Sequence, residues 1–192
     1  LSFLVLLPGV PTLLTVSHSR CLERGVCKSA FSHPTGYAIR RAAEADLVRL
    51  RRYEIPIKRV ARKLCLDPAL IGGIMSQESR VGLLLDNGWD RGQQKYGLMQ
   101  VLQGDNRQQL RPYVAWDSEE HINQCSNILV LSINEVRARH PTWTWDRQLR
   151  DGISAYNADV NTVQTYDKMI VGKTHNYDDV DARVRLYKRN EY

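Results

Sequence analysis

Residues 67–80 read Asp-Pro-Ala-Leu-Ile-Gly-Gly-Ile-Met-Ser-Gln-Glu-Ser-Arg and predict a helix with an acidic side chain on its apolar face. Asp67 suits the N-cap position, and Pro68 suits the first helical position, which needs no N–H partner. The apolar residues of the stretch recur at helical spacing, and Glu78 follows Ile74 by four residues. Glu78 therefore lies on the same stripe as the apolar side chains.

A carboxyl group at that position is suited to donate a proton. Burial and the negative end of the helix dipole both raise the pKa of a carboxyl group, so we expect a raised pKa for Glu78. A glutamic acid that stays protonated near neutral pH can act as a general acid. The competing interpretation is a buried Glu paired with an Arg, or a frayed helix end that turns the side chain into solvent, and position alone favours it.

Helical periodicity extends through most of the remaining chain, which has 192 residues and suits one domain. A polar, Gly-rich segment at residues 82–117 interrupts it, with short strands or loops expected around Gly97–Val101. Asp117 and Glu120 resemble a capping box at the start of a long helix that His140-Pro141 ends. The pattern predicts a mainly α (α+β) fold with further helices at residues 38–52, 55–66, 145–156 and 178–189.

The loop that follows Glu78 contains two more carboxylates. It reads Asp86-Asn87-Gly88-Trp89-Asp90-Arg91-Gly92. An inverting glycoside hydrolase needs an acid on one side of the scissile bond and a carboxylate-held water on the other. A helix-end Glu facing a loop Asp satisfies that need, although such acids are also common turn formers.

The start of the chain and its cysteines indicate export. Residues 1–19 are expected to be a truncated secretory signal, with a buried N-terminal strand as the alternative, and residues 20–192 the mature domain. The four cysteines, Cys21, Cys27, Cys65 and Cys125, allow three pairings and show no zinc-site spacing. Disulfide bonding is the expected role of these cysteines in an exported protein.

The formal net charge is +6, and much of the positive excess lies between Arg40 and Lys63. A basic exported protein is attracted to anionic partners such as bacterial walls or acidic lipids. The alternative is an ordinary solvated helix face that Glu44, Asp46 and Glu54 partly neutralise.

Four motifs in order resemble those of the goose-type lysozymes. They are Ser76-Gln77-Glu78-Ser79, Asn87-Gly88-Trp89-Asp90-Arg91-Gly92, Gly97-Leu98-Met99-Gln100-Val101 and Gly152-Ile153-Ser154-Ala155-Tyr156-Asn157-Ala158. The resemblance extends from about Cys27 to Tyr192. It implies a lysozyme-like helical domain with a small β-sheet beside the active-site cleft.

The resemblance also implies the chemistry. The family hydrolyses the β-1,4 bond between N-acetylmuramic acid and N-acetylglucosamine in peptidoglycan, with inversion. Glu78 is then the general acid, Asp90 orients water, and Tyr156, Asn157 and Tyr177 bind substrate. We further expect a secreted, antibacterial monomer that acts on peptidoglycan and chitin-like oligosaccharides. No cofactor, no metal, no specific nucleic-acid ligand and no stable membrane anchor are expected.

The sequence departs from the family pattern at several points. Leu102 stands where the family carries a second Asp, and Asp105 is the nearest replacement. One residue is missing between Trp89 and Asp90. Cys65 matches a family disulfide position and is expected to pair with Cys21 or Cys27. These departures favour a weakened enzyme and keep two alternatives open: a cationic glycan-binding protein that has lost most catalysis, and lytic transglycosylase chemistry.

Overall fold

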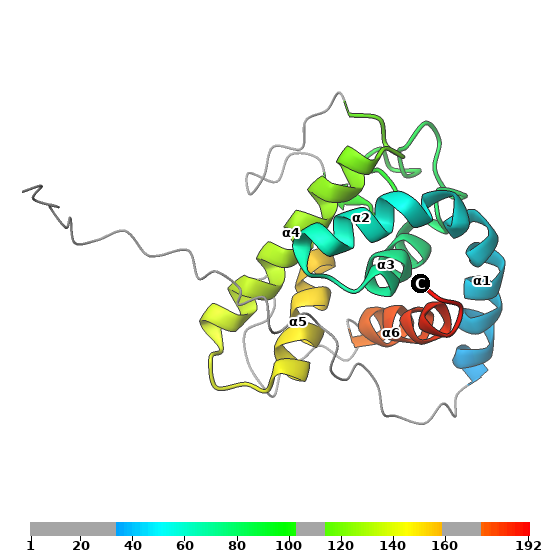
Figure 1. Cartoon of the computed structure of the whole chain (residues 1–192). Coiled ribbons are helices and arrows are strands. Elements are labelled where there is room, and N and C mark those ends of the chain that lie inside the picture. The colour runs from blue at the N-terminus through cyan, green and yellow to red at the C-terminus, as the bar shows by residue number, and fades with distance from the viewer. Residues whose placement is uncertain (1–33, 103–113, 159–173) are drawn as a thin grey trace, which may run out of the picture.

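The computed structural model describes residues 34–102, 114–158 and 174–192, and this part of the chain is mainly helical (Figure 1), as predicted. The expected signal at residues 1–19 lies outside it. No described helix is long and apolar enough to span a membrane. The elements, in chain order, are α1 Pro34–Leu50, the 3₁₀ turn η2 Arg51–Tyr53, α2 Glu54–Leu64, α3 Pro68–Ser79, β1 Lys95–Tyr96, β2 Val101–Leu102, α4 Glu119–Arg139, α5 Trp145–Ala158 and α6 Thr174–Arg189.

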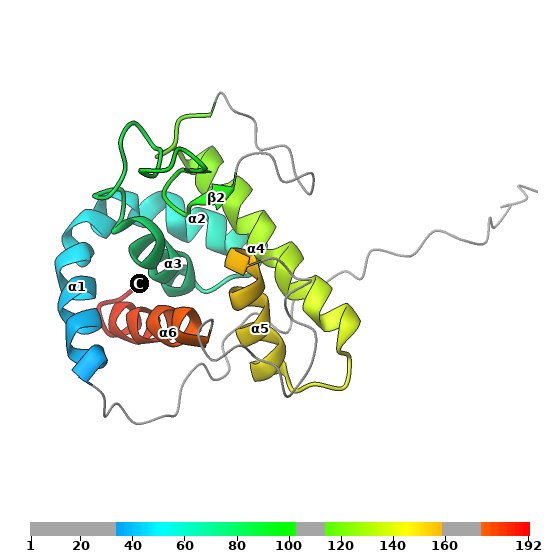
Figure 2. The same cartoon turned by 180° about the vertical axis from the view of Figure 1, so that it is seen from behind.

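Helix α3 is the central element, and α1, α2 and α6 pack around it (Figures 1 and 2). Two adjacent glycines permit this close packing. A Cβ on Gly72 would lie 2.9 Å from Leu50 Cδ2 of α1, and one on Gly73 would lie 2.9 Å from Val184 Cγ2 of α6. Helix α3, which residues 67–80 predict, therefore lies at the core of the molecule.

Most of the predicted helix boundaries are confirmed, and one cap is corrected. The Asp67 side chain accepts a hydrogen bond from the Ala69 N–H at 2.9 Å, and His140 ends α4, both as predicted. Asp117 does not cap α4. Ser118 does, since its hydroxyl accepts from the His121 N–H at 3.2 Å. Ser and Asp are similar N-cap residues, so sequence preference alone does not distinguish two adjacent candidates.

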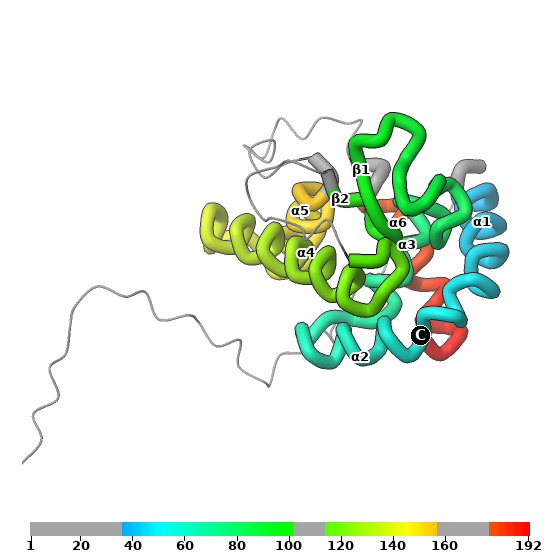
Figure 3. The backbone as a smooth tube through the Cα atoms, turned by 90° about the horizontal axis from the view of Figure 1, so that it is seen from above, coloured from blue at the N-terminus to red at the C-terminus, as the bar shows by residue number. Residues whose placement is uncertain are grey.

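A small hairpin follows the loop after α3 (Figure 3), where short strands or loops were expected. Strands β1 and β2 are antiparallel and pair Lys95 with Leu102 and Tyr96 with Val101. The chain turns between them at Gly97, whose φ is +84°. A Cβ on Gly97 would lie 1.7 Å from His121 Nε2, so only glycine fits there.

A buried carboxylate connects α1 to the end of α3. Asp46 is 0% exposed and accepts hydrogen bonds from Ser76 Oγ at 2.7 Å and from Arg80 Nε at 2.7 Å. Arg49 forms a further ion pair with it. From α6, Arg183 Nε donates to Ser76 Oγ at 3.0 Å. The sequence interpretation of Asp46 as part of a solvated face is therefore wrong, because two of its partners, Ser76 and Arg80, lie 30 and 34 residues away along the chain and bury it.

Asp46→Asn should destabilise the fold strongly. The change leaves two guanidinium groups without their anion in a partly buried site, and breaking such a pair costs about 3 kcal/mol or more. The midpoint of thermal unfolding should fall on the order of 10 °C in a domain of this size. Glu44→Gln on the same helix is the control, because its ion pair with Arg40 is exposed and contributes little. Equal midpoints for the two variants in calorimetry would contradict this role of Asp46.

Candidate active site

Glu78 lies in the last turn of α3, at the border between core and surface. Its side chain is partly exposed, whereas Ser76 and Ser79 on either side are fully buried. Arg80 ends the helix in the left-handed conformation, with its N–H directed to the carbonyls of Met75 and Ser76. The carboxyl group is thus held at a capped helix end and is partly exposed to solvent.

Tyr156 of α5 lies close to Glu78. Its hydroxyl donates to the Met99 carbonyl at 3.0 Å. Burial raises the pKa of Tyr156 well above its usual value, and the nearby Cys125 and Glu78 raise it further. The phenol therefore stays neutral. Two residues that the sequence assigned to one site are brought together.

The turn between the strands is attached directly to the end of α3. Ser79 Oγ donates to the Leu98 carbonyl at 2.7 Å and accepts from the Gly82 N–H at 2.9 Å. Within the turn, the backbone and side-chain nitrogens of Gln100 both donate to the Gly97 carbonyl, at 3.0 and 2.8 Å. The motif Gly97–Val101 thus forms one wall beside the Glu78 helix end.

Asp90 forms the tight turn that leads into β1. Its Oδ1 accepts from the backbone N–H groups of Gln94 at 2.8 Å and Lys95 at 3.0 Å. These bonds, that of Lys95 foremost, hold the pKa of Asp90 below its usual value. The side chain is therefore a carboxylate at neutral pH. Its described partners all lie in residues 92–95, so the turn-forming alternative applies to this residue.

Position 102, where the resemblance implies a second Asp, lies next to this turn. Leu102 pairs with Lys95 across the hairpin, and the N–H of Lys95 is the one that Asp90 binds. A residue at position 102 is therefore separated from the Asp90 turn by a single strand. Asp105, the nearest replacement, lies outside the described residues, as does the side chain of Asn157 at the end of α5.

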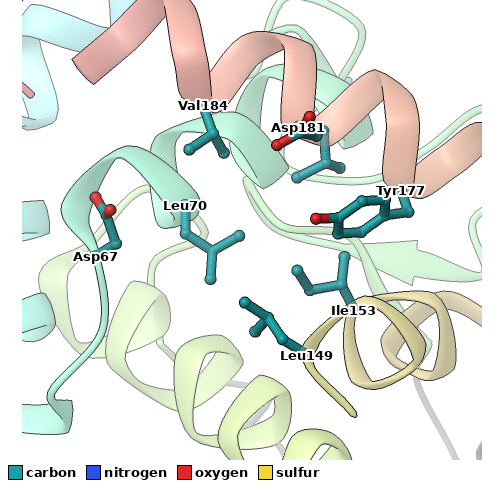
Figure 4. A pocket seen from close by; sticks show the side chains of 8 residues that line it. Asp67, Leu70, Leu149, Ile153, Tyr177, Asp181 and Val184 are labelled. Carbon is teal, nitrogen blue, oxygen red and sulfur yellow. The ribbon is translucent and has the colours of Figure 1, made fainter. Parts of the chain in front are cut away.

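Tyr177 lies apart from Glu78 in the described contacts, at the junction of α5 and α6. The Arg150 guanidinium carbon is 4.8 Å from its ring centroid. Burial is the main reason that the pKa of Tyr177 is raised. Figure 4 shows its ring at the edge of a small pocket, whose lining includes Leu70 of α3, Leu149 and Ile153 of α5 and Val184 of α6. Helices α3, α5 and α6, which carry Glu78, Tyr156 and Tyr177, meet at this pocket.

Two buried residues of α4 support the site and were not identified from the sequence. His121 lies under Gly97, edge-on to the Tyr96 ring at 5.3 Å, and burial lowers the pKa of its imidazole. Cys125 Sγ is 3.4 Å from His121 Nε2, and burial raises the pKa of this thiol to about 12. Spacing of four residues on one helix face was the only available signal for this pair.

Cys65 and Cys125 do not form a disulfide with each other, and Cys21 and Cys27 lie outside the described residues. The expected bond from Cys65 to either of them therefore stays a prediction. Among the described residues, no cluster of three or more His, Cys, Asp or Glu side chains has the arrangement of a metal site.

The sequence is similar to those of known proteins over most of its length. The family model described as Lysozyme g matches residues 26–191. The lysozyme g of Struthio camelus is 39% identical over 98% of both chains. That of Casuarius casuarius is 41% identical, covering 86% of this chain and 91% of its own. The lysozyme g-like protein 2 of Mus musculus is 39% identical over 78% of this chain and 67% of its own. The chain belongs to the lysozyme g family.

Proposed function

We propose that this protein is an antibacterial muramidase that hydrolyses the β-1,4 bond between N-acetylmuramic acid and N-acetylglucosamine in peptidoglycan. Family membership supports the reaction class. The observation that carries the assignment is the position of Glu78, at the end of the buried helix α3 and beside Tyr156 and the Gly97–Gln100 turn. Secretion, a monomeric state and action on chitin-like oligosaccharides belong to the same proposal.

Glu78 is proposed as the general acid that protonates the leaving glycosidic oxygen. The Tyr156 hydroxyl donates its hydrogen bond to the Met99 carbonyl, and Tyr156 lies close enough to Glu78 for the two groups to interact electrostatically. Glu78 also lies in the last turn of α3, where the negative end of the helix dipole favours the protonated form of a carboxylic acid. The raised pKa expected from the sequence stays a prediction, which the pH dependence of activity tests.

Asp90 is proposed to orient the water that attacks the anomeric carbon, with inversion of configuration. Oδ1 accepts the bonds from Gln94 and Lys95, and a carboxylate has about four lone-pair sites, so the group can also hold a water molecule. Forming the turn and holding water are therefore compatible roles for one carboxylate. Tyr156, Asn157 and Tyr177 complete the proposal as substrate-binding residues.

Leu102 is proposed to weaken the enzyme. With leucine at position 102, which pairs with Lys95 in the hairpin, the chain offers one carboxylate where the family pattern has two. A water molecule held by one acceptor is less well positioned and less basic. The same loss favours lytic transglycosylase chemistry as a second candidate, since closure of the muramic acid on itself needs no added water. An anhydro end in the product would identify that reaction.

Glu78→Gln should lower the rate of wall clearing by about 10²–10⁴-fold, the usual contribution of a general acid. Glutamine has nearly the same shape, so the end of α3 should remain folded. The measurement is clearing of a Gram-positive wall suspension, with Glu135→Gln as the control because its ion pair with Arg139 is exposed. Full activity of the Glu78 variant would remove this residue from the mechanism.

Asp90→Asn should cost less than Glu78→Gln, about tenfold. The Asn carbonyl can still accept from Gln94 and Lys95, so the turn survives and only the charge is lost. Turnover of a soluble chitin oligosaccharide, with product anomers followed by NMR, tests the role. Asp86→Asn, an exposed residue of the same loop, is the control. A loss equal to that of Glu78→Gln would instead identify Asp90 as the principal base.

Leu102→Asp should increase turnover, by about tenfold, because it restores a second carboxylate beside the attacking water. Leu102→Asn has a similar shape without the charge and should give no increase. The rates of both variants on the same oligosaccharide decide the point. Unchanged turnover in Leu102→Asp would show that the substitution at this position is tolerated and that the parent enzyme is not weakened by it.

A further inference from the structure

A band of exposed cations runs along η2 and the outer face of α2. We call it the α2 cationic face, and its members are Arg51, Arg52, Arg59, Arg62 and Lys63. Positions 55, 59 and 62 recur at helical spacing, so they share one side of α2, and Arg51 and Arg52 lie in the turn that leads into it. Ile55, at the centre, is 70% exposed. The proposed catalysis uses none of these residues.

Most of these cations have no anionic partner within the described part of the chain. Arg59 pairs with Glu119 of α4 at 2.9 Å, while Arg51, Arg52, Arg62 and Lys63 form no described ion pair. Lys58, at the border of the face, is neutralised by Glu54 at 2.6 Å. Four unneutralised charges within thirteen consecutive residues create a strong local positive potential.

The face is narrow, because acidic and aromatic groups limit it on both sides. The Arg59–Glu119 contact places the acidic start of α4, which also carries Glu120 and follows Asp117, along one edge. Along the other edge lies Tyr192, whose ring centroid is 5.9 Å from Lys58 Nζ. Figure 3 shows the start of α4 and the C-terminus both near α2. A flat anionic bilayer would contact the acidic residues at the start of α4 as well as the cations, and those acids would repel it. A linear anionic polymer can follow the cations without contacting the acids.

The composition of the face indicates which kind of chain it fits. Guanidinium groups bind phosphate oxygens in pairs, and three of the four unneutralised cations are arginines. Sites for single-stranded nucleic acid combine cations with exposed aromatic rings that stack on bases. Here Tyr53 and Tyr192 are partly buried, and the exposed apolar side chain is the aliphatic Ile55.

We propose that the α2 cationic face binds a linear phosphodiester polymer of the bacterial wall, of the polyol-phosphate type. The choice of a wall polymer rests on the proposed function, but binding itself does not depend on hydrolysis. Adsorption along α2 would keep the enzyme at its insoluble substrate. Adsorption would also compensate for a weakened catalytic site, because a bound enzyme encounters glycan strands repeatedly.

The test compares two variants with the same net charge. The face variant is Arg51→Gln/Arg52→Gln/Arg62→Gln/Lys63→Gln. Arg59 is kept, because its ion pair with Glu119 connects α2 to α4. The control variant is Arg40→Gln/Arg41→Gln/Arg137→Gln/Arg139→Gln, whose four side chains are exposed on other surfaces. The pairs of Arg40 with Glu44 and of Arg139 with Glu135 lie within single helices and are exposed, so losing them costs little stability. Both variants should retain the thermal midpoint of the parent and its turnover of an uncharged chitin oligosaccharide.

Affinity for synthetic poly(glycerol phosphate) is measured by calorimetry over a range of salt concentrations. The face variant should bind at least tenfold more weakly, and its slope of log K against log salt should be shallower by about 3. The control variant should change much less in both respects. Equal losses in the two variants would overturn the proposal, because net charge alone would then explain binding.

Two further arms exclude other anionic partners. Vesicles of phosphatidylglycerol test a lipid surface, and an unstructured DNA strand of equal phosphate number tests nucleic acid. The proposal requires the face variant to lose more affinity for poly(glycerol phosphate) than for either of them. If the larger loss is for vesicles or DNA, the face binds that partner and the wall-polymer assignment is wrong.

Discussion

The buried carboxylate of Asp46 is the constraint on which the arrangement of this molecule depends. An ionised group with no exposed surface is tolerated only when donors surround it, and here they come from the end of α3, at Ser76 and Arg80, and from Arg49. Satisfying Asp46 therefore fixes the last turn of α3 against α1, and Arg183 fixes it against α6 through Ser76. Glu78 lies in that same turn. The position of the proposed acid is thus a consequence of a charge that takes no part in the chemistry.

Local patterns predicted those features that depend on neighbours in sequence. The Asp67 cap, the helical face that carries Leu149, Ile153 and Tyr156, and the end of α4 at His140 each depend on contacts within one or two turns. The buried role of Asp46 and the contact of Gly97 with His121 were not predicted. Both depend on pairs more than twenty residues apart, which periodicity does not encode.

In the candidate site too, sequence motifs identified residues, whereas contacts between distant parts of the chain determined how they are arranged. Glu78 and Tyr156 were assigned from their motifs, and the structure brings them together because α5 packs beside the Gly97–Gln100 turn. For Asp90, the sequence offered a turn former or a catalytic carboxylate as alternatives. The structure shows the turn bonds, which come from backbone N–H groups and keep the group ionised. Sequence reasoning treated these roles as competing because residue type alone does not show which bonds a carboxylate makes.

The first turn of α4 links the Gly97–Val101 turn beside Glu78 to the α2 cationic face. Within three residues, Glu119 pairs with Arg59 on α2, while His121 supports the Gly97 turn from below. A polymer that drew Arg59 away from Glu119 would disturb a helix start that Ser118 also caps. Because Gly97 leaves no space for His121 to shift, such a disturbance would reach the hairpin that carries Lys95 and the Asp90 turn. The α2 cationic face and the surface that carries Glu78 are therefore separate, and the first turn of α4 supports both. The direct packing of α2 on α3, which carries Glu78, provides a second connection between them.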